Sequence, residues 1–138
     1  MKTSKRVTPT DQEYDAAATL REALRRFARR TELLTRDQGL TARTYQLLLM
    51  IKTGRNEPGR ASLGELEDRL QLGKSTITEL VLRGEDAGLV RRELDRTRRR
   101  GISVALTPDG ERRLAAVLLA LGDERERLLE LLAGLAPG

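Results

Sequence analysis

The sequence of 138 residues contains no cysteine and no histidine. Without cysteine there are no disulfides, thiolate metal ligands or thiol nucleophiles, and without histidine the commonest zinc ligand and the commonest general base are missing. The serine, threonine, lysine and acidic residues that remain fall in no recognised catalytic arrangement. We therefore expect no metal site, no cofactor and no enzyme activity.

Aromatic side chains and long apolar runs are also scarce. The aromatic residues are Tyr14, Phe27 and Tyr45, which argues against a ring-stacking platform for single-stranded nucleic acid. No segment approaches the ~18 apolar residues of a membrane span, and the N-terminal residues lack the apolar stretch of a signal peptide. We expect a cytoplasmic protein without a membrane partner, folded as a single domain over residues 1–138.

Positive charge is what the sequence has in excess. Lysine and arginine number 26 against 21 acidic residues, which gives a net charge of +5. Six arginines fall within residues 91–100, and like charges this close together repel one another. Such a cluster is useful where phosphates approach it, although a solvated turn would have the same composition.

Capping signals and helical periodicity predict the helices of the first two-thirds of the chain. A first helix follows the capping box Thr10–Glu13 and extends to about Thr35, with an apolar stripe. Thr41 caps a buried helix over 42–53, and residues 55–60 form a loop. A second capping box, Ser62–Glu65, opens a short helix to about Leu70. A turn at 71–73 then leads to a helix over 74–87. The predicted inward-facing residues are Ala17, Leu20, Leu24, Phe27 and Ala28 in the first helix, and Ile77, Leu80, Val81 and Ala87 in the helix at 74–87.

The periodicity then changes to that of strands. Leu89 and Val90 lead into a strand that ends near Leu94. Ile102, Val104 and Leu106 alternate with Ser103 and Ala105 as in a half-buried strand, so the arginine cluster lies in a hairpin loop. Thr107 and Pro108 are a helix start, and the leucine-rich region 108–133 is divided at Gly122, which predicts two helices or one kinked helix.

A short helix, a tight turn, a longer helix and a β-hairpin follow one another in the order of a winged helix-turn-helix. In that motif the second helix enters the major groove of DNA, and arginines in a hairpin loop suit a narrow minor groove. The candidate DNA-binding residues are Lys74, Ser75, Thr76, Thr78, Glu79 and Arg83 in the helix, and Arg96, Arg98, Arg99 and Arg100 in the loop.

Three stretches resemble the MarR-type transcription regulators. The stretch 39–47 is similar to the family's entry into its second helix, and 62–90 to its helix-turn-helix. Leu106-Thr107-Pro108-Asp109-Gly110 is similar to the Leu-Thr-x-x-Gly that follows the family's wing. The resemblance implies a mainly α fold with a small β-hairpin wing, in which a winged helix-turn-helix is flanked by N- and C-terminal dimerisation helices. On this basis residues 41–107 form the DNA-binding lobe, and 1–36 and 108–138 the dimerisation helices.

The resemblance also implies a homodimeric regulator of double-stranded DNA, usually a repressor, that binds a pseudo-palindromic operator. Many members of the family are released by a small aromatic or phenolic ligand, and the candidate ligand-binding residues here are Tyr14, Arg21, Phe27 and Tyr45. The alternative is a winged-helix module that docks a protein and does not bind DNA, which Glu79 and Leu82 on the reading face would favour.

Overall fold

The computed structural model describes residues 6–95 and 101–136. Within these residues the chain forms six helices and three strands, and no helix is both long enough and apolar enough to cross a membrane. The chain divides into two compact units. Unit 1 comprises Met1–Thr31 and Leu121–Gly138, and unit 2 comprises Glu32–Ala120.

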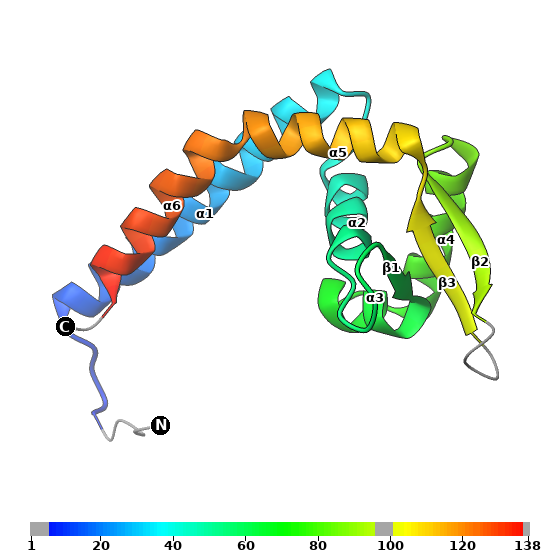
Figure 1. Cartoon of the computed structure of the whole chain (residues 1–138). Helices are drawn as coiled ribbons and strands as arrows, with labels where there is room; N and C mark the ends of the chain where they lie inside the picture. The colour runs from blue at the N-terminus through cyan, green and yellow to red at the C-terminus, as the bar shows by residue number, and fades with distance from the viewer. Residues whose placement is uncertain (1–5, 96–100, 137–138) are drawn as a thin grey trace. The chain divides into compact units, whose positions relative to one another are not determined.

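Unit 1 is built from two antiparallel helices, the first part of α1 (Asp11–Asp37) and α6 (Gly122–Leu135) (Figure 1). The capping box that the sequence predicts at the start of α1 is confirmed. The backbone N–H of Glu13 donates to Thr10 Oγ1 at 3.1 Å, and the N–H of Thr10 donates to Glu13 Oε1 at 2.9 Å. These two bonds satisfy amide groups that the helix itself leaves without an acceptor.

The predicted apolar stripe of α1 is only partly correct. Leu20 and Phe27 are half-buried, but Ala17, Leu24 and Ala28 are exposed. The residue of this stretch that is buried is Ala23, which lines a pocket with residues of α6. The sequence pattern contained apolar residues over a wide arc, whereas one neighbouring helix covers only a narrow stripe.

Unit 2 has α2 (Ala42–Lys52) at its centre. Leu47, Leu48 and Ile51 have no exposed surface, as the run of apolar residues in this helix predicts. The elements that follow are β1 (Arg60–Ser62), α3 (Leu63–Leu70), α4 (Lys74–Asp86), β2 (Val90–Asp95), β3 (Gly101–Leu106) and α5 (Pro108–Ala120). The region after residue 107 therefore forms two helices, one of the two outcomes that the sequence left open.

The hairpin that the sequence predicts belongs to a sheet of three antiparallel strands, in the order β1-β3-β2. Val104 of the central strand pairs with Arg92 on one side and with Ala61 on the other. The prediction of a plain loop up to residue 60 is wrong at its end, because Arg60 begins β1. Three residues are too few to show an alternating pattern, so this strand exists only through its pairing with β3.

The connection from α4 to the hairpin is made by Gly88. This residue has a φ of +75°, and the N–H of Leu89 donates to the carbonyl of Gly84 at 2.9 Å. The helix thus ends in the Schellman geometry that glycine favours. Ala87, which the sequence places on the inward face, is exposed, because the helix ends at this point and the residue no longer faces the core.

Thr107, which follows β3, is hydrogen-bonded to residues 88 and 89, which precede β2, and to Gly110 in α5. Thr107 donates its backbone N–H to the carbonyl of Leu89 at 3.0 Å and its hydroxyl to the carbonyl of Gly88 at 2.6 Å. The same hydroxyl oxygen accepts the N–H of Gly110 at 3.1 Å and so caps α5. Thr107 therefore links the turn between α4 and β2 to the start of α5.

Candidate nucleic-acid interface

The helices α3 and α4 are joined by a three-residue turn, 71–73, which is the helix-turn-helix predicted from the sequence. Ser62 caps α3 through the N–H of Glu65 at 3.1 Å. At the other end of α3, Gln71 adopts the left-handed conformation with a φ of +55°. The N–H of Leu72 reaches back to the carbonyl of Glu67 at 3.3 Å, and this closes the turn that sets the direction of α4.

Arg69 fixes α3 against the end of α2. Its Nη1 donates to the carbonyls of Met50 at 3.0 Å and Thr53 at 3.1 Å, and its Nη2 donates to Thr53 Oγ1 at 3.0 Å. Glu65 lies 3.3 Å from the same Nη1, and both side chains are almost buried. The guanidinium thus satisfies carbonyls that the last turn of α2 leaves free. Sequence patterns did not reveal this role, because the partners lie 16 and 19 residues away.

The two faces of α4 differ in burial. Ile77, Leu80, Val81 and Gly84 are buried in unit 2. On the opposite face the predicted reading residues Lys74, Ser75, Thr78, Glu79 and Arg83 are exposed, together with Leu82. Thr76 is half-buried and lies at the edge of that face. The structure therefore brings five of the six predicted residues of this helix to one surface and leaves the sixth at its margin.

The N-terminus of α4 is uncapped. The helices α2, α3 and α5 each have a threonine or serine hydroxyl as N-cap acceptor, whereas the N-cap of α4 is Gly73, with no side-chain cap. The first N–H groups of α4 therefore remain available as donors at the same end as Lys74 and Ser75. An uncapped helix N-terminus with adjacent lysine and serine suits a phosphate group.

Glu79 and Arg83 form an ion pair one helical turn apart, and both side chains are largely exposed. The pair neutralises an acid that would otherwise repel the phosphates of DNA. An open hollow runs along this face, lined by Lys74, Ser75, Thr78, Glu79 and Leu82. All of its lining residues belong to one helix, so the hollow is an open surface and not an enclosed cavity.

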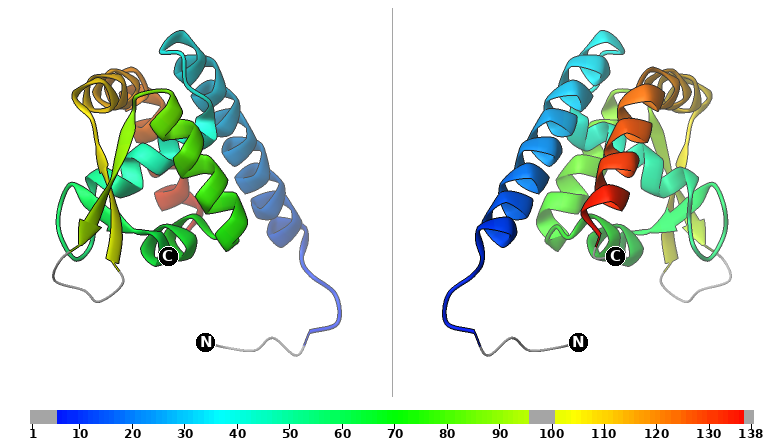
Figure 2. Two further views of the ribbon diagram at one scale, coloured as in Figure 1. Left: turned by 90° about the vertical axis from the view of Figure 1, so that its right-hand side faces the viewer. Right: turned by 90° about the vertical axis from the view of Figure 1, so that its left-hand side faces the viewer.

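The hairpin β2–β3 is tied to its surroundings by two ion pairs. Arg92 lies 3.0 Å from Glu85 at the end of α4, and Glu93 lies 3.2 Å from Arg60 in β1. Figure 2 shows the hairpin with α4 in two views. The pairing extends to Asp95 opposite Gly101. The four predicted wing residues between them lie outside the described residues: Arg96, Arg98, Arg99 and Arg100.

Comparison with known proteins agrees with this geometry. Residues 38–101, which include α2, the helix-turn-helix and β2, match the model of the MarR family. Residues 38–101 belong to the MarR family. Among solved structures of MarR-family transcriptional regulators, AbsC from Streptomyces coelicolor is 28% identical, with 96% of this chain and 86% of AbsC covered and a TM-score of 0.76.

Two further MarR-type structures were solved with DNA. Sco3205 from Streptomyces coelicolor, in complex with DNA, is 24% identical over 91% of this chain and 78% of that protein, with a TM-score of 0.74. A mutant MarR from E. coli, in complex with operator DNA, is 19% identical over 88% of this chain and 85% of that protein, with a TM-score of 0.69. At these identities the likeness shows the fold alone. No curated protein has a sequence that matches this chain.

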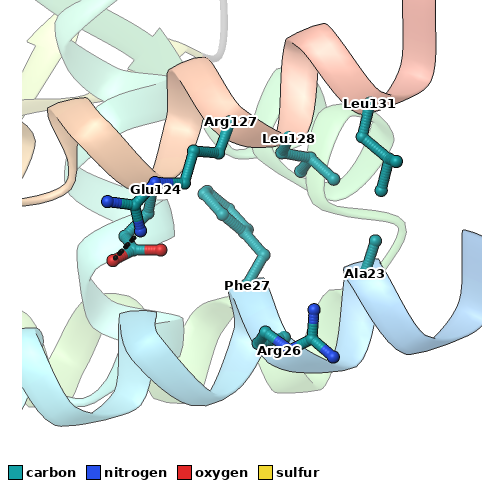
Figure 3. A pocket seen from close by; sticks show the side chains of 7 residues that line it. All are labelled: Ala23, Arg26, Phe27, Glu124, Arg127, Leu128 and Leu131. Atoms are coloured by element: carbon teal, nitrogen blue, oxygen red, sulfur yellow. Dashed lines mark ion pairs between the residues drawn. The ribbon is translucent and has the colours of Figure 1, made fainter. Parts of the chain in front are cut away.

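The candidate ligand-binding residues lie in different units of this protein. Tyr14, Arg21 and Phe27 lie on α1 in unit 1, and Tyr45 is buried in α2 in unit 2. Phe27 lines a partly open pocket of about 220 Å³ between α1 and α6 in unit 1. Figure 3 shows its ring pointing from α1 towards α6. The other lining residues are Ala23, Arg26, Glu124, Arg127, Leu128 and Leu131.

Proposed function

We propose that this chain is a sequence-specific regulator of transcription that binds double-stranded DNA as a homodimer and represses by occupying a pseudo-palindromic operator. We propose a binding function and no catalytic one, exercised in the cytoplasm, where operator DNA is accessible. The family of residues 38–101 is one of transcription regulators. The observation that carries the proposal is α4, which buries Ile77 and Val81 and exposes Lys74, Ser75 and Thr78 beside an uncapped helix N-terminus.

The exposed face of α4 has the chemistry of a DNA-reading surface. Lys74 supplies positive charge, and Arg83 compensates the charge of Glu79. Ser75 and Thr78 supply short side chains that fit a major groove. The predicted wing arginines, Arg96 and 98–100, would add phosphate or minor-groove contacts. Phosphate contacts position the protein on the duplex, and contacts with base edges supply the sequence preference.

Exposed apolar side chains in unit 1 support the homodimer. Tyr14 and Leu24 of α1 are 59% and 41% exposed, and Leu129 of α6 is 59% exposed. Two packed helices bury too little surface to hide these groups within one protomer, and a second copy would cover them. A two-fold dimer would present two copies of α4, which matches half-sites about 10 base pairs apart.

A small aromatic or phenolic acid is the effector that we propose for release from the operator. The pocket at Phe27 combines an aromatic ring and leucines with the guanidinium groups of Arg26 and Arg127. An aromatic acid needs an apolar lining for its ring and a cation for its carboxylate. Arg21, Tyr14 and Tyr45 remain part of the proposal only through the family resemblance.

Selection from random duplexes with the purified protein tests the function. Sequences enriched after several rounds should share an inverted repeat, and they should bind more tightly than random duplexes of the same length. Sedimentation at micromolar concentration should give the mass of a dimer. If no duplex binds even at low salt, the winged helix is a protein-interaction module. If the protein sediments as a monomer and selects an asymmetric sequence, the dimer is wrong.

A further inference from the structure

The exposed side chain of Thr78 has its hydroxyl bonded to the backbone of its own helix. Its hydroxyl donates to the carbonyl of Lys74, four residues earlier, at 2.9 Å. A threonine hydroxyl has a single proton, so this bond leaves only its acceptor lone pairs and its methyl group for a ligand. A hydroxyl bonded to the helix backbone also fixes the side-chain rotamer. Thr78 is thus a poor donor to a purine N7 or O6, although it is exposed.

Leu82 continues this apolar surface by one helical turn. It lies four residues after Thr78 on the same face, and 41% of its surface is exposed. Thr78 and Leu82 both line the open hollow on the outer face of α4. A single exposed leucine needs no explanation, but here a leucine and a fixed threonine methyl adjoin each other at the centre of the face that we propose to read DNA.

Charged groups flank the apolar surface formed by Thr78 and Leu82. Lys74 lies at its N-terminal end, and Glu79 on one side is paired with Arg83. The pair neutralises Glu79, whereas Asp86, one helical turn after Leu82, is an exposed acid at the C-terminal end of this surface. In the major groove the thymine C5 methyl is the apolar group that a methyl-bearing side chain contacts, whereas the edges of guanine and cytosine offer polar atoms.

We propose that Thr78 and Leu82 form a methyl-reading surface that selects thymine at a defined position of each operator half-site. This inference rests on the proposed function, because it requires α4 to lie in the major groove. The inference names the base that α4 selects, thymine, and the chemical group by which α4 recognises it, the C5 methyl. Leu82 is then a specificity-determining residue, which the sequence pattern alone did not place among the DNA-binding residues.

Deoxyuridine is the probe for this inference, because it differs from thymidine only by the missing methyl group. Each thymine of the selected operator is replaced in turn by deoxyuridine in both half-sites, and Kd is measured by fluorescence anisotropy at one salt concentration. At one position, or at two adjacent positions, Kd should rise about fourfold per half-site, the fold-change expected for one buried methyl group. The other positions should show no change.

Protein variants identify the side chains that sense the methyl group. With Leu82→Ala and with Thr78→Ser, which keeps the hydroxyl and removes the methyl, the effect of deoxyuridine at that position should disappear. Thr78→Val keeps the methyl and removes the hydroxyl, so it should keep the sensitivity. Thermal unfolding of each variant should match the original protein, because both side chains are exposed.

The outcomes separate this inference from the proposed function. If the protein binds its operator specifically but no deoxyuridine replacement changes Kd, or if Leu82→Ala and Thr78→Ser keep the full effect, the methyl-reading surface is wrong and the DNA-binding function stands. If the selected half-site contains no thymine, the methyl-reading surface is likewise wrong and the DNA-binding function stands. If no duplex is bound specifically, the proposed function itself fails.

Discussion

Gly110 lies so close to the carbonyl oxygen of Leu89 that a Cβ at position 110 would sit 2.1 Å from that oxygen. The same oxygen accepts the N–H of Thr107 at 3.0 Å. The start of α5 therefore approaches the start of β2 backbone to backbone, and only a glycine permits that distance. This close approach is the physical reason why a glycine follows the Leu-Thr pair at this point of the chain.

Gly110→Ala should destabilise the protein by about 2 kcal/mol or more, because the backbone of Leu89 cannot yield as a flexible side chain would. Denaturant unfolding followed by circular dichroism measures the change. Gly64→Ala is the matched control: Gly64 is also helical and exposed, and nothing lies within 4 Å of its Cβ position. The control should be stabilised by about 0.5–1 kcal/mol. Equal effects of the two changes would contradict the close approach.

Arg69→Ala should be the most damaging removal of a single charge in the helix-turn-helix. The change leaves the carbonyls of Met50 and Thr53 without this donor and removes the cation beside the nearly buried Glu65. We expect a loss of about 3 kcal/mol in the free energy of unfolding. Arg69→Lys should recover only part of it, because one ammonium group cannot reach all of these acceptors at once.

The control for Arg69 is Arg83→Ala, which breaks an ion pair of the same i,i+4 spacing whose side chains are 73% and 63% exposed. Its effect on stability should stay within about 0.5 kcal/mol. A comparable loss in both variants would mean that the burial of Arg69 has no energetic consequence.

Glu13 should titrate well below an ordinary carboxyl group. Its two oxygens accept from Arg6 at 2.6 and 2.8 Å, and one of them also accepts the N–H of Thr10. Mainly through the bonds from Arg6, and then through that N–H, its pKa falls from 4.5 to about 2. A carboxyl whose pKa is lowered by folding stabilises the fold above its unfolded pKa, and this contribution is lost as the pH falls from about 4.5 to 2.

NMR titration of the Glu13 side chain measures this pKa directly. Arg6→Ala should raise the midpoint towards 4.5 without reaching it, since the N–H of Thr10 still donates to the carboxylate. Arg36→Ala, which removes an exposed arginine at the far end of α1, should leave the midpoint unchanged. A Glu13 midpoint that is the same with and without Arg6 would refute the assignment.

The arginines of the hairpin loop should govern the salt dependence of DNA binding. We expect the triple change of Arg98, Arg99 and Arg100 to alanine to weaken binding strongly at physiological salt. It should also flatten the slope of log affinity against log salt by about 1 for each DNA phosphate that the variant no longer neutralises. Folding should survive, because the sheet pairing involves residues outside this segment.

The control for the loop removes the same charge elsewhere in unit 2. The triple change of Arg36, Arg43 and Arg55 to alanine affects exposed positions outside α4 and the hairpin, and the salt slope should stay close to that of the original protein. If both triple variants shift the slope equally, the loop arginines act only through net charge.

The boundaries of the helices and the existence of the hairpin were determined by the sequence itself. Caps such as Thr10, Thr41 and Ser62 act on N–H groups three residues away, and Gly88 acts on the turn in which it lies. Helical periodicity at 74–86 depends equally on near neighbours. The predicted half-buried alternation at 102–106 is wrong, because Ile102 is exposed while Ser103 and Ala105 are buried with Val104 and Leu106 in the central strand of the sheet. The order of these elements was enough to predict the winged helix-turn-helix and most of the residues on the exposed face of α4.

What the tertiary structure decided depends on contacts between residues far apart in the chain. The strand β1 exists because Ala61 pairs with Val104, and Arg69 caps a helix whose C-cap residue, Thr53, lies 16 residues before it. Ala23 rather than Leu24 is buried in α1, because the position of a neighbouring helix selects which part of a wide apolar arc is covered. Sequence patterns encode which residues can be buried, but the partner surface decides which of them are buried, since burial is a property of two surfaces that touch.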